Sequence, residues 1–115
     1  MYDISIITVN FNSSDDTLEM IKSVKKLTNV NYEIIVIDNA SHNDEYKKLQ
    51  ILQNDTNVVL HRSRINLGFA CGNILGVQKA SKGSKYYFFL NNDTILINNV
   101  VDILFNTMQN SLDIG

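Results

Sequence analysis

Two stretches of sequence, Ile4-Ser5-Ile6-Ile7-Thr8-Val9 and Glu33-Ile34-Ile35-Val36-Ile37, decide the fold class. Each is a short run rich in β-branched residues, without the clean alternation of apolar and polar side chains that marks a half-exposed strand. A near-continuous apolar run is typical of a strand that is covered on both faces of a sheet. Similar runs over Asn57–Leu60 and Tyr86–Leu90 predict two more strands. We therefore expect a central, mainly parallel sheet.

The segments between these runs have helical character. In the first of them the apolar residues recur every three positions, which gives one apolar stripe toward the sheet, and Ser13, Ser14 or Asp15 is expected to cap its first turn. Strands that alternate with helices imply right-handed βαβ units and a doubly wound α/β sheet with helices on both faces. The predicted helices are Asp16–Leu27, Asp44–Gln53, Ala70–Lys82 and Asn98–Gln109.

Composition and charge exclude several classes of protein. The chain has 115 residues, enough for one domain, with 44% hydrophobic and 19% charged residues, as in soluble globular proteins. Its net charge of -2 gives no basic surface for nucleic acid. Cys71 is the only cysteine, and neither a signal peptide nor an apolar run of the ~20 residues that cross a bilayer is apparent, so we expect a cytoplasmic protein. The end at Leu112–Gly115, where a further strand is expected, suggests a fragment.

Polar residues follow every predicted strand, and ligands of open α/β sheets bind at the carboxyl ends of the strands. The four clusters are Thr8–Ser13, Asp38–Ser41, Arg62–Phe69 and Asn91–Thr94. Asp38 is expected to face the cleft, where its carboxylate can accept a hydrogen bond from a nucleobase or a ribose, although Asp-Asn-Ala-Ser is equally good turn chemistry. Arg62 and Arg64 either reach a diphosphate or lie in solvent.

Three glycines, Gly68, Gly72 and Gly76, run from a loop into the third predicted helix. Glycine inside a helix costs up to ~1 kcal/mol relative to alanine, so the backbone is expected to approach another group closely. For Gly68 we favour a diphosphate at the start of the helix, and for Gly76 we favour close packing on the sheet. The spacing matches neither the dinucleotide fingerprint nor a P-loop.

Asn91-Asn92-Asp93-Thr94 places one carboxylate between polar neighbours at the end of an apolar strand. Mg²⁺ or Mn²⁺ on a nucleotide diphosphate needs only one or two protein carboxylates, because phosphate oxygens and water complete its coordination. Asp93 suits that role, and a simple turn is the alternative.

Taken together, the four clusters closely resemble the family-two glycosyltransferases, in particular rhamnosyltransferase-like members, over essentially the whole chain. The resemblance implies a GT-A fold, a UDP-, dTDP- or GDP-sugar donor, a divalent metal, and inverting transfer to a saccharide or a lipid-linked glycan in polysaccharide biosynthesis. It also suggests that the protein is located in the cytoplasm or at the inner face of the membrane. Residues 1–115 would then form the nucleotide-sugar-binding part of the transferase domain.

The resemblance also assigns roles to individual residues. It implies a nucleoside pocket at Thr8, Val9 and Asn10 with the base on Asp38 and the neighbouring Asn39, and a nucleotide lying along Asn66 and Gly68. The Asp-x-Asp metal motif corresponds to Asn91, Asn92 and Asp93, with Asp93 as the metal ligand. Asn91 departs from the motif. No residue here corresponds to the family's catalytic base, so the chain is expected to bind its donor without turnover.

Two other functions compete with this interpretation. A receiver-like signalling module would accept a phosphoryl group on Asp38, but it requires an acidic pair where this chain has Asn10 and Asn12. A noncatalytic assembly domain would form homo-oligomers through an open sheet edge.

Overall fold

The computed structural model describes residues 2–111 and contains one four-stranded parallel sheet with the strand order β3-β2-β1-β4. The predicted parallel α/β sheet is confirmed, and each strand overlaps its predicted range. The strands are β1 (Ile4–Asn10), β2 (Tyr32–Asn39), β3 (Val58–Ser63) and β4 (Tyr86–Phe89).

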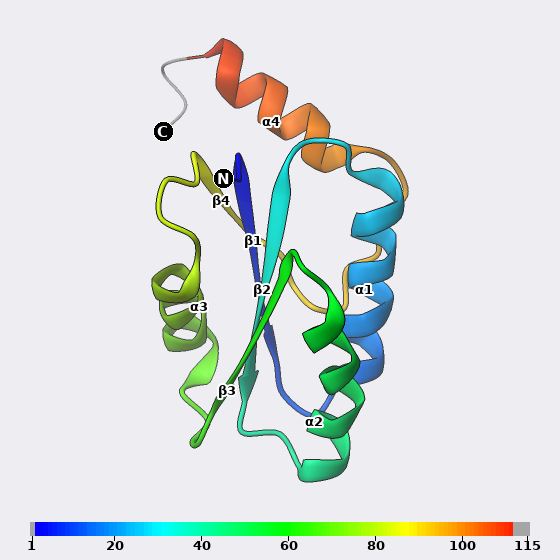
Figure 1. Ribbon diagram of the computed structural model, residues 1–115, viewed down its shortest axis with the longest axis vertical. Helices are drawn as coiled ribbons and strands as arrows, with labels where there is room; N and C mark the ends of the chain where they lie inside the picture. Colours follow the sequence, from blue (N-terminus) through cyan, green and yellow to red (C-terminus); the bar gives the residue numbers. More distant parts are fainter. Residues whose placement is uncertain (1, 112–115) are drawn as a thin grey trace.

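Helices cover both faces of this sheet, as predicted. α1 (Ser14–Leu27) and α2 (Asn43–Leu49) lie on one face and α3 (Gly68–Lys79) lies on the other (Figure 1). The chain proceeds from β1 to β3 in one direction and then returns past β1 to β4, so crossovers of one hand put α3 on the opposite face. The second helix is shorter than predicted, because it tightens into a 3₁₀ helix at Gln50–Asn54.

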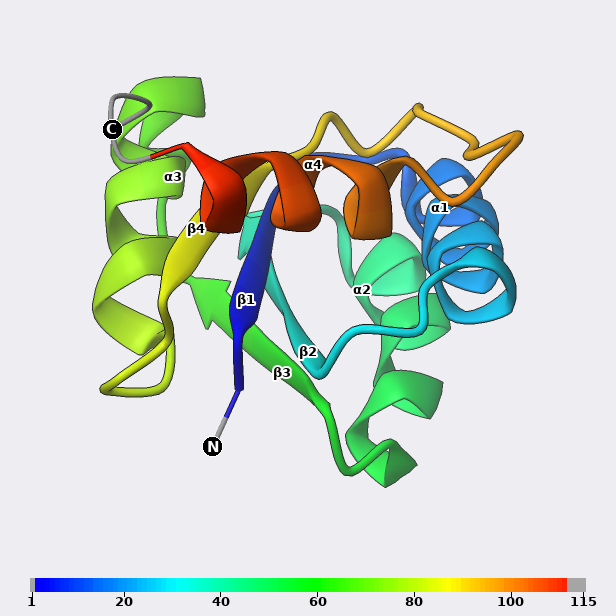
Figure 2. The same cartoon turned by 90° about the horizontal axis from the view of Figure 1, so that it is seen from above.

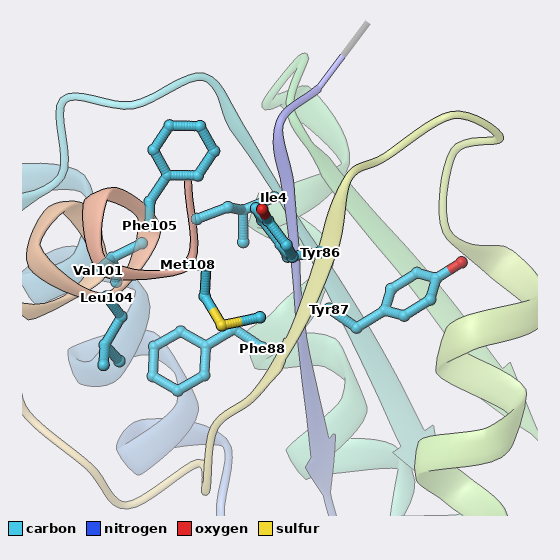
Figure 3. Close-up of a pocket in the computed structure, with 8 residues that line it drawn as sticks. All are labelled: Ile4, Tyr86, Tyr87, Phe88, Val101, Leu104, Phe105 and Met108. Atoms are coloured by element: carbon cyan, nitrogen blue, oxygen red, sulfur yellow. The ribbon is translucent and has the colours of Figure 1, made fainter. Parts of the chain in front are cut away.

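The fourth helix, α4 (Val100–Asn110), lies at the amino-terminal end of the sheet, opposite the ends where the strands stop (Figure 1). Figure 2 shows it passing across β4 and β1. Together with β4 it encloses an apolar hollow of about 180 Å³. Phe88 and Met108 point into this hollow, whereas Tyr87 points to the other side of β4 (Figure 3).

Alternate residues of β1 and β2 supply two separate cores, because successive side chains of a strand point to opposite faces. Ile6 and Ile34 pack with Met20 and Val24 of α1 in the larger core, which also includes residues of α2 and α4. The smaller core, formed by Ile7, Ile35 and Ile37, packs against α3.

The expectation that every strand is covered on both faces is wrong for the outer strands. Tyr87 and Phe89 of β4 remain 47% and 50% exposed, and Val59 of β3 is also exposed. α3 packs on β1 and β2, and a single helix is too narrow to shield the whole sheet. None of the helices between residues 2 and 111 is long and apolar enough to cross a membrane. The strand expected at Leu112–Gly115 lies outside the described residues.

Candidate functional site

The polar cleft at the carboxyl ends of the strands forms where the strand order reverses, between β1 and β4. This topological switch point is where open α/β sheets bind their ligands. The cleft has a volume of about 290 Å³. Five of its lining residues were predicted to bind substrate, namely Val9, Asn39, Asn66, Gly68 and Asn92. Phe11, Ser13 and Phe69 also line it; they lie in the predicted strand-end clusters but were given no role of their own.

Phe11 and Phe69 are conspicuous in this cleft because they are 49% and 60% exposed. Two large aromatic side chains at the edge of an otherwise polar site offer apolar surface to a ligand. The available sequence signal was an aromatic residue embedded in each of two polar clusters that follow a strand.

Asn39 holds the loop that leads into α3. Its side-chain amide donates to the carbonyl of Gly68 at 2.9 Å and its Oδ1 accepts from the backbone N–H of Leu67 at 3.0 Å. Asn66 Oδ1 accepts from the N–H of Gly68 at 2.8 Å, and Gly68 has a φ of +78°, a conformation that favours glycine. Asn39 therefore shapes the wall of the cleft at the first turn of α3, where free backbone N–H groups favour anions.

The other two glycines of α3 allow the helix to lie close to the sheet. A Cβ atom on Gly72 would lie 3.0 Å from Val9 Cγ2, and one on Gly76 would overlap Ile7 Cγ2. The packing interpretation of Gly76 is confirmed. Nothing lies within 4 Å of a Cβ built on Gly68, so that position is open to the cleft.

Three residues predicted to bind substrate, Thr8, Asn10 and Asp38, are fully buried beneath the other face of the sheet. The expectation that Asp38 faces the cleft is therefore wrong for this structure. In β2, Asp38 points to the same face as Ile34 and Val36, and its neighbour Asn39 points to the cleft. The sequence predicts where a strand ends. It does not predict which of two adjacent side chains faces the cleft, because successive side chains of a strand point to opposite faces of the sheet.

The carboxylate of Asp38 is engaged by other buried groups. Oδ1 accepts from Asn10 Nδ2 at 2.9 Å and from Ser41 Oγ at 2.6 Å, and Oδ2 accepts from the Ser41 N–H at 3.2 Å. The Nε of Arg62 lies 3.6 Å from Oδ2. A nucleobase could reach Asp38 only by displacing such partners. Thr8 Oγ1 has no hydrogen-bond partner among residues 2–111.

Arg62 is neither free in solvent nor directed into the polar cleft. Its Nη2 donates to the Ser41 carbonyl at 2.7 Å and to Asn43 Oδ1 at 3.1 Å, while the guanidinium lies 4.5 Å from the Tyr46 ring centroid. Arg62 therefore closes the buried network around Asp38. Arg62 and Arg64 also line a neighbouring hollow of about 290 Å³.

The segment after β4 forms a tight turn, in which the Thr94 N–H donates to the Asn91 carbonyl at 3.1 Å. Asn91 and Asp93 are exposed and do not line the cleft directly, whereas Asn92 between them is half-buried and does. The Asp93 carboxylate makes no hydrogen bond or ion pair with the described residues. Both residues therefore lie at the rim of the cleft.

The residues at this rim fit only one kind of divalent-metal site. Within the described part of the chain, no group of three or more His, Cys, Asp or Glu side chains could enclose an ion. Asp93 could still hold Mg²⁺ or Mn²⁺ that takes its other ligands from phosphate and water, which is how Mg²⁺ usually binds to nucleotides. Such an ion would bind together with a phosphorylated ligand.

An open α/β sheet with a polar cleft at its switch point has the architecture of an α/β ligand-binding domain. The chain belongs to glycosyl transferase family 2, whose model matches residues 5–114. The fold resembles that of S. aureus TarS 1–349, with a TM-score of 0.78 and 18% identity over 94% of this chain and 32% of that one. TarS 1–349 has also been solved with UDP, at a TM-score of 0.77, and with UDP-GlcNAc, at 0.78.

Two curated proteins also match, both described as uncharacterized glycosyltransferases. The one from Rickettsia bellii (strain RML369-C) is 28% identical over 106 residues, which are 92% of this chain and 15% of the relative. The one from Rickettsia conorii (strain ATCC VR-613 / Malish 7) is 30% identical over 106 residues, or 92% of this chain and 17% of the relative. The chain thus spans less than a fifth of either relative.

Proposed function

We propose that this chain binds the nucleoside-diphosphate-sugar donor of a glycosyltransferase in the cleft at the carboxyl ends of β1 and β4. The observation that carries this proposal is the convergence of Phe11, Asn66, Gly68 and Asn92 on one cleft at the switch point of a family-two member. The TarS structures with UDP and UDP-GlcNAc support a nucleotide sugar as the ligand, and UDP-, dTDP- and GDP-sugars are the candidates.

In this proposal the flat parts of the donor and its phosphates contact different kinds of protein groups. The exposed phenyl rings of Phe11 and Phe69 offer apolar surface to flat parts of the donor, and the first turn of α3 offers N–H groups to its phosphates. Asp93 would hold Mg²⁺ or Mn²⁺, which would neutralise charge on the departing diphosphate. Asn91, next to it at the rim, is free to contact the donor.

The type of reaction is proposed from the resemblance to family-two glycosyltransferases. We propose inverting transfer of a hexosyl unit, rhamnose being the candidate from the sequence, to a saccharide or lipid-linked glycan in polysaccharide biosynthesis. The catalytic base would lie outside this chain, so the chain alone would bind donor without transferring sugar. Release of the nucleotide diphosphate by the isolated chain in the presence of acceptor would contradict that. We further propose that the protein acts in the cytoplasm or at the inner face of the membrane, which cell fractionation would test.

Calorimetric titration with UDP tests the metal-dependent part of the proposal. In the presence of Mn²⁺, Asp93→Asn should weaken UDP binding by about tenfold, or roughly 1.4 kcal/mol. With EDTA the variant and the wild type should bind alike, because only the metal contact is removed. Asp44→Asn, which changes another exposed carboxylate without a partner, is the matched control. Equal affinity of Asp93→Asn and wild type in Mn²⁺ would refute the assignment of Asp93.

The competing functions receive different support. A receiver-like module is disfavoured because the Asp38 carboxylate is fully buried and hydrogen-bonded, so it cannot meet a phosphodonor without rearrangement. Self-association through the edge of β4 stays a proposal, supported by the exposed Tyr87 and Phe89 on that outer strand. Light scattering on the eluting peak would show a dimer if the edges pair and a monomer if they do not.

A further inference from the structure

The side chain of Asn92 points inward from the turn after β4 and binds to the start of α1. Its Nδ2 donates to Ser13 Oγ at 2.7 Å and to Thr17 Oγ1 at 3.1 Å. Asn10 Oδ1 at 3.4 Å and the Ser13 carbonyl at 3.5 Å are more distant acceptors. An amide group has two N–H donors, so Ser13 and Thr17 are its main partners. These bonds join segments more than 70 residues apart in the chain.

The partners of Asn92 are themselves held in place. Thr17 is buried and its hydroxyl donates to Asn10 Oδ1 at 2.7 Å, while the amide of Asn10 donates to Asp38. Ser13 occupies the N-cap position of α1, yet its side chain makes no capping hydrogen bond. The expectation of a side-chain cap at Ser13 is therefore wrong. The Ser13 hydroxyl faces Asn92 instead of the backbone of its own helix.

The residues on either side of Asn92 have the opposite orientation. Asn91 and Asp93 are exposed, and neither side chain has a partner among the described residues. Of these three consecutive side chains, only that of Asn92 makes hydrogen bonds to the rest of the described chain. We infer that Asn92 is a positioning residue, which holds the Asn91–Thr94 turn on the start of α1 so that Asn91 and Asp93 project at the rim of the cleft.

Amide hydrogen exchange tests this inference without any ligand. The N–H of Thr94 closes the turn, so its exchange rate reports whether the turn stays formed. Asn92→Leu, which keeps the branching at Cγ but has no donor, should accelerate exchange of Thr94 by about tenfold, the effect of losing a net hydrogen bond or two. Ser13→Ala should accelerate it less. Asn98→Ala, an exposed amide in the next loop, is the matched control and should leave it unchanged. Unchanged protection of Thr94 in Asn92→Leu would overturn the inference.

The consequence for binding rests on the proposed function and needs a second measurement. Asn92→Leu should weaken UDP binding in Mn²⁺ by about five- to tenfold and change uridine binding by less than about twofold, because only the diphosphate end is displaced. Asn92→Asp should recover part of the loss, since the hydroxyl of Ser13 can donate to a carboxylate. An equal loss for UDP and uridine, or no loss for UDP, would contradict the positioning role. If the wild-type chain binds no UDP, the proposed function fails, and the exchange of Thr94 still decides whether Asn92 holds the turn.

Discussion

At the scale of single residues, Gly68 and Gly76 belong to one helix but are required for different reasons. Gly68→Ala should destabilise the fold by roughly 1–2 kcal/mol, because alanine is strained at a φ of +78°. Gly76→Ala should cost about 1–3 kcal/mol through overlap with Ile7, partly offset by up to ~1 kcal/mol of helix propensity. Urea unfolding of both variants, alone and combined with Ile7→Ala, separates these causes. Ile7→Ala should remove most of the cost of Gly76→Ala and none of the cost of Gly68→Ala; equal effects would contradict this account.

The same scale shows what sequence reasoning could and could not assign in the site. The polar clusters indicated the carboxyl ends of the strands as the place of the cleft. Five of the predicted residues line it: Val9, Asn39, Asn66, Gly68 and Asn92. Asp38 does not line that cleft, because its side chain points to the other face of β2. Phe11 and Phe69 lay within the predicted clusters but received no role, because the prediction relied on the polar residues of each cluster. The ligands of the individual residues remain predictions.

At the scale of elements, a buried carboxylate at the start of β2 fixes the connection from α3 to β4. Glu33 is 2% exposed and accepts from Ser5 Oγ at 2.6 Å, the Ser81 N–H at 2.7 Å and Ser81 Oγ at 2.9 Å. Glu33→Ala leaves those donors unsatisfied and should lower the free energy of unfolding by about 3 kcal/mol. Glu19→Ala, on the exposed side of α1, should change it by less than about 0.5 kcal/mol. Similar midpoints of chemical denaturation for the two variants would refute this role of Glu33.

The partial burial of His61 in β3 makes stability depend on pH. Burial, and secondly the charge of Lys79, lower the pKa of His61 below its ordinary value of 6.5. The unfolded chain therefore binds a proton near pH 6.5 that the folded chain binds only at lower pH, so the free energy of unfolding should fall as pH decreases from 7 through 6.5. His61→Gln should flatten that decline, and Lys79→Gln should reduce it. Thermal unfolding between pH 5.5 and 7.5 measures both, and an unchanged decline in His61→Gln would show that another group causes it.

The boundaries of elements were harder to predict than their types. The apolar runs located all four strands, but β3 continues to Ser63, since Arg62 lies within the strand and reaches back toward Asp38. Its charged side chain interrupts the apolar pattern without ending the backbone pairing. α3 likewise begins at Gly68, before the predicted start at Ala70, because Asn39 and Asn66 hold the entering loop.

At the scale of the whole molecule, the parallel topology followed from apolar strands that alternate with helices, whereas the strand order did not. The order matters because the reversal between β1 and β4 creates the cleft. Pairing of β4 beside β1, not beside β3, depends on long-range contacts that no local pattern encodes. The incomplete cover of the outer strands also depends on long-range contacts, because these determine which strands α3 packs against.

The most direct test of the central claim is to map the binding of UDP and Mg²⁺ by NMR on the amide signals of the chain. The largest shifts should occur at Phe11, at Gly68 and Phe69, and at the Asn91–Thr94 turn, all at the carboxyl ends of the strands. Residues around the apolar hollow between β4 and α4, at the other end of the sheet, should not shift (Figure 3). Shifts confined to that hollow, or none at millimolar UDP, would contradict the claim that the cleft at the switch point binds the donor nucleotide.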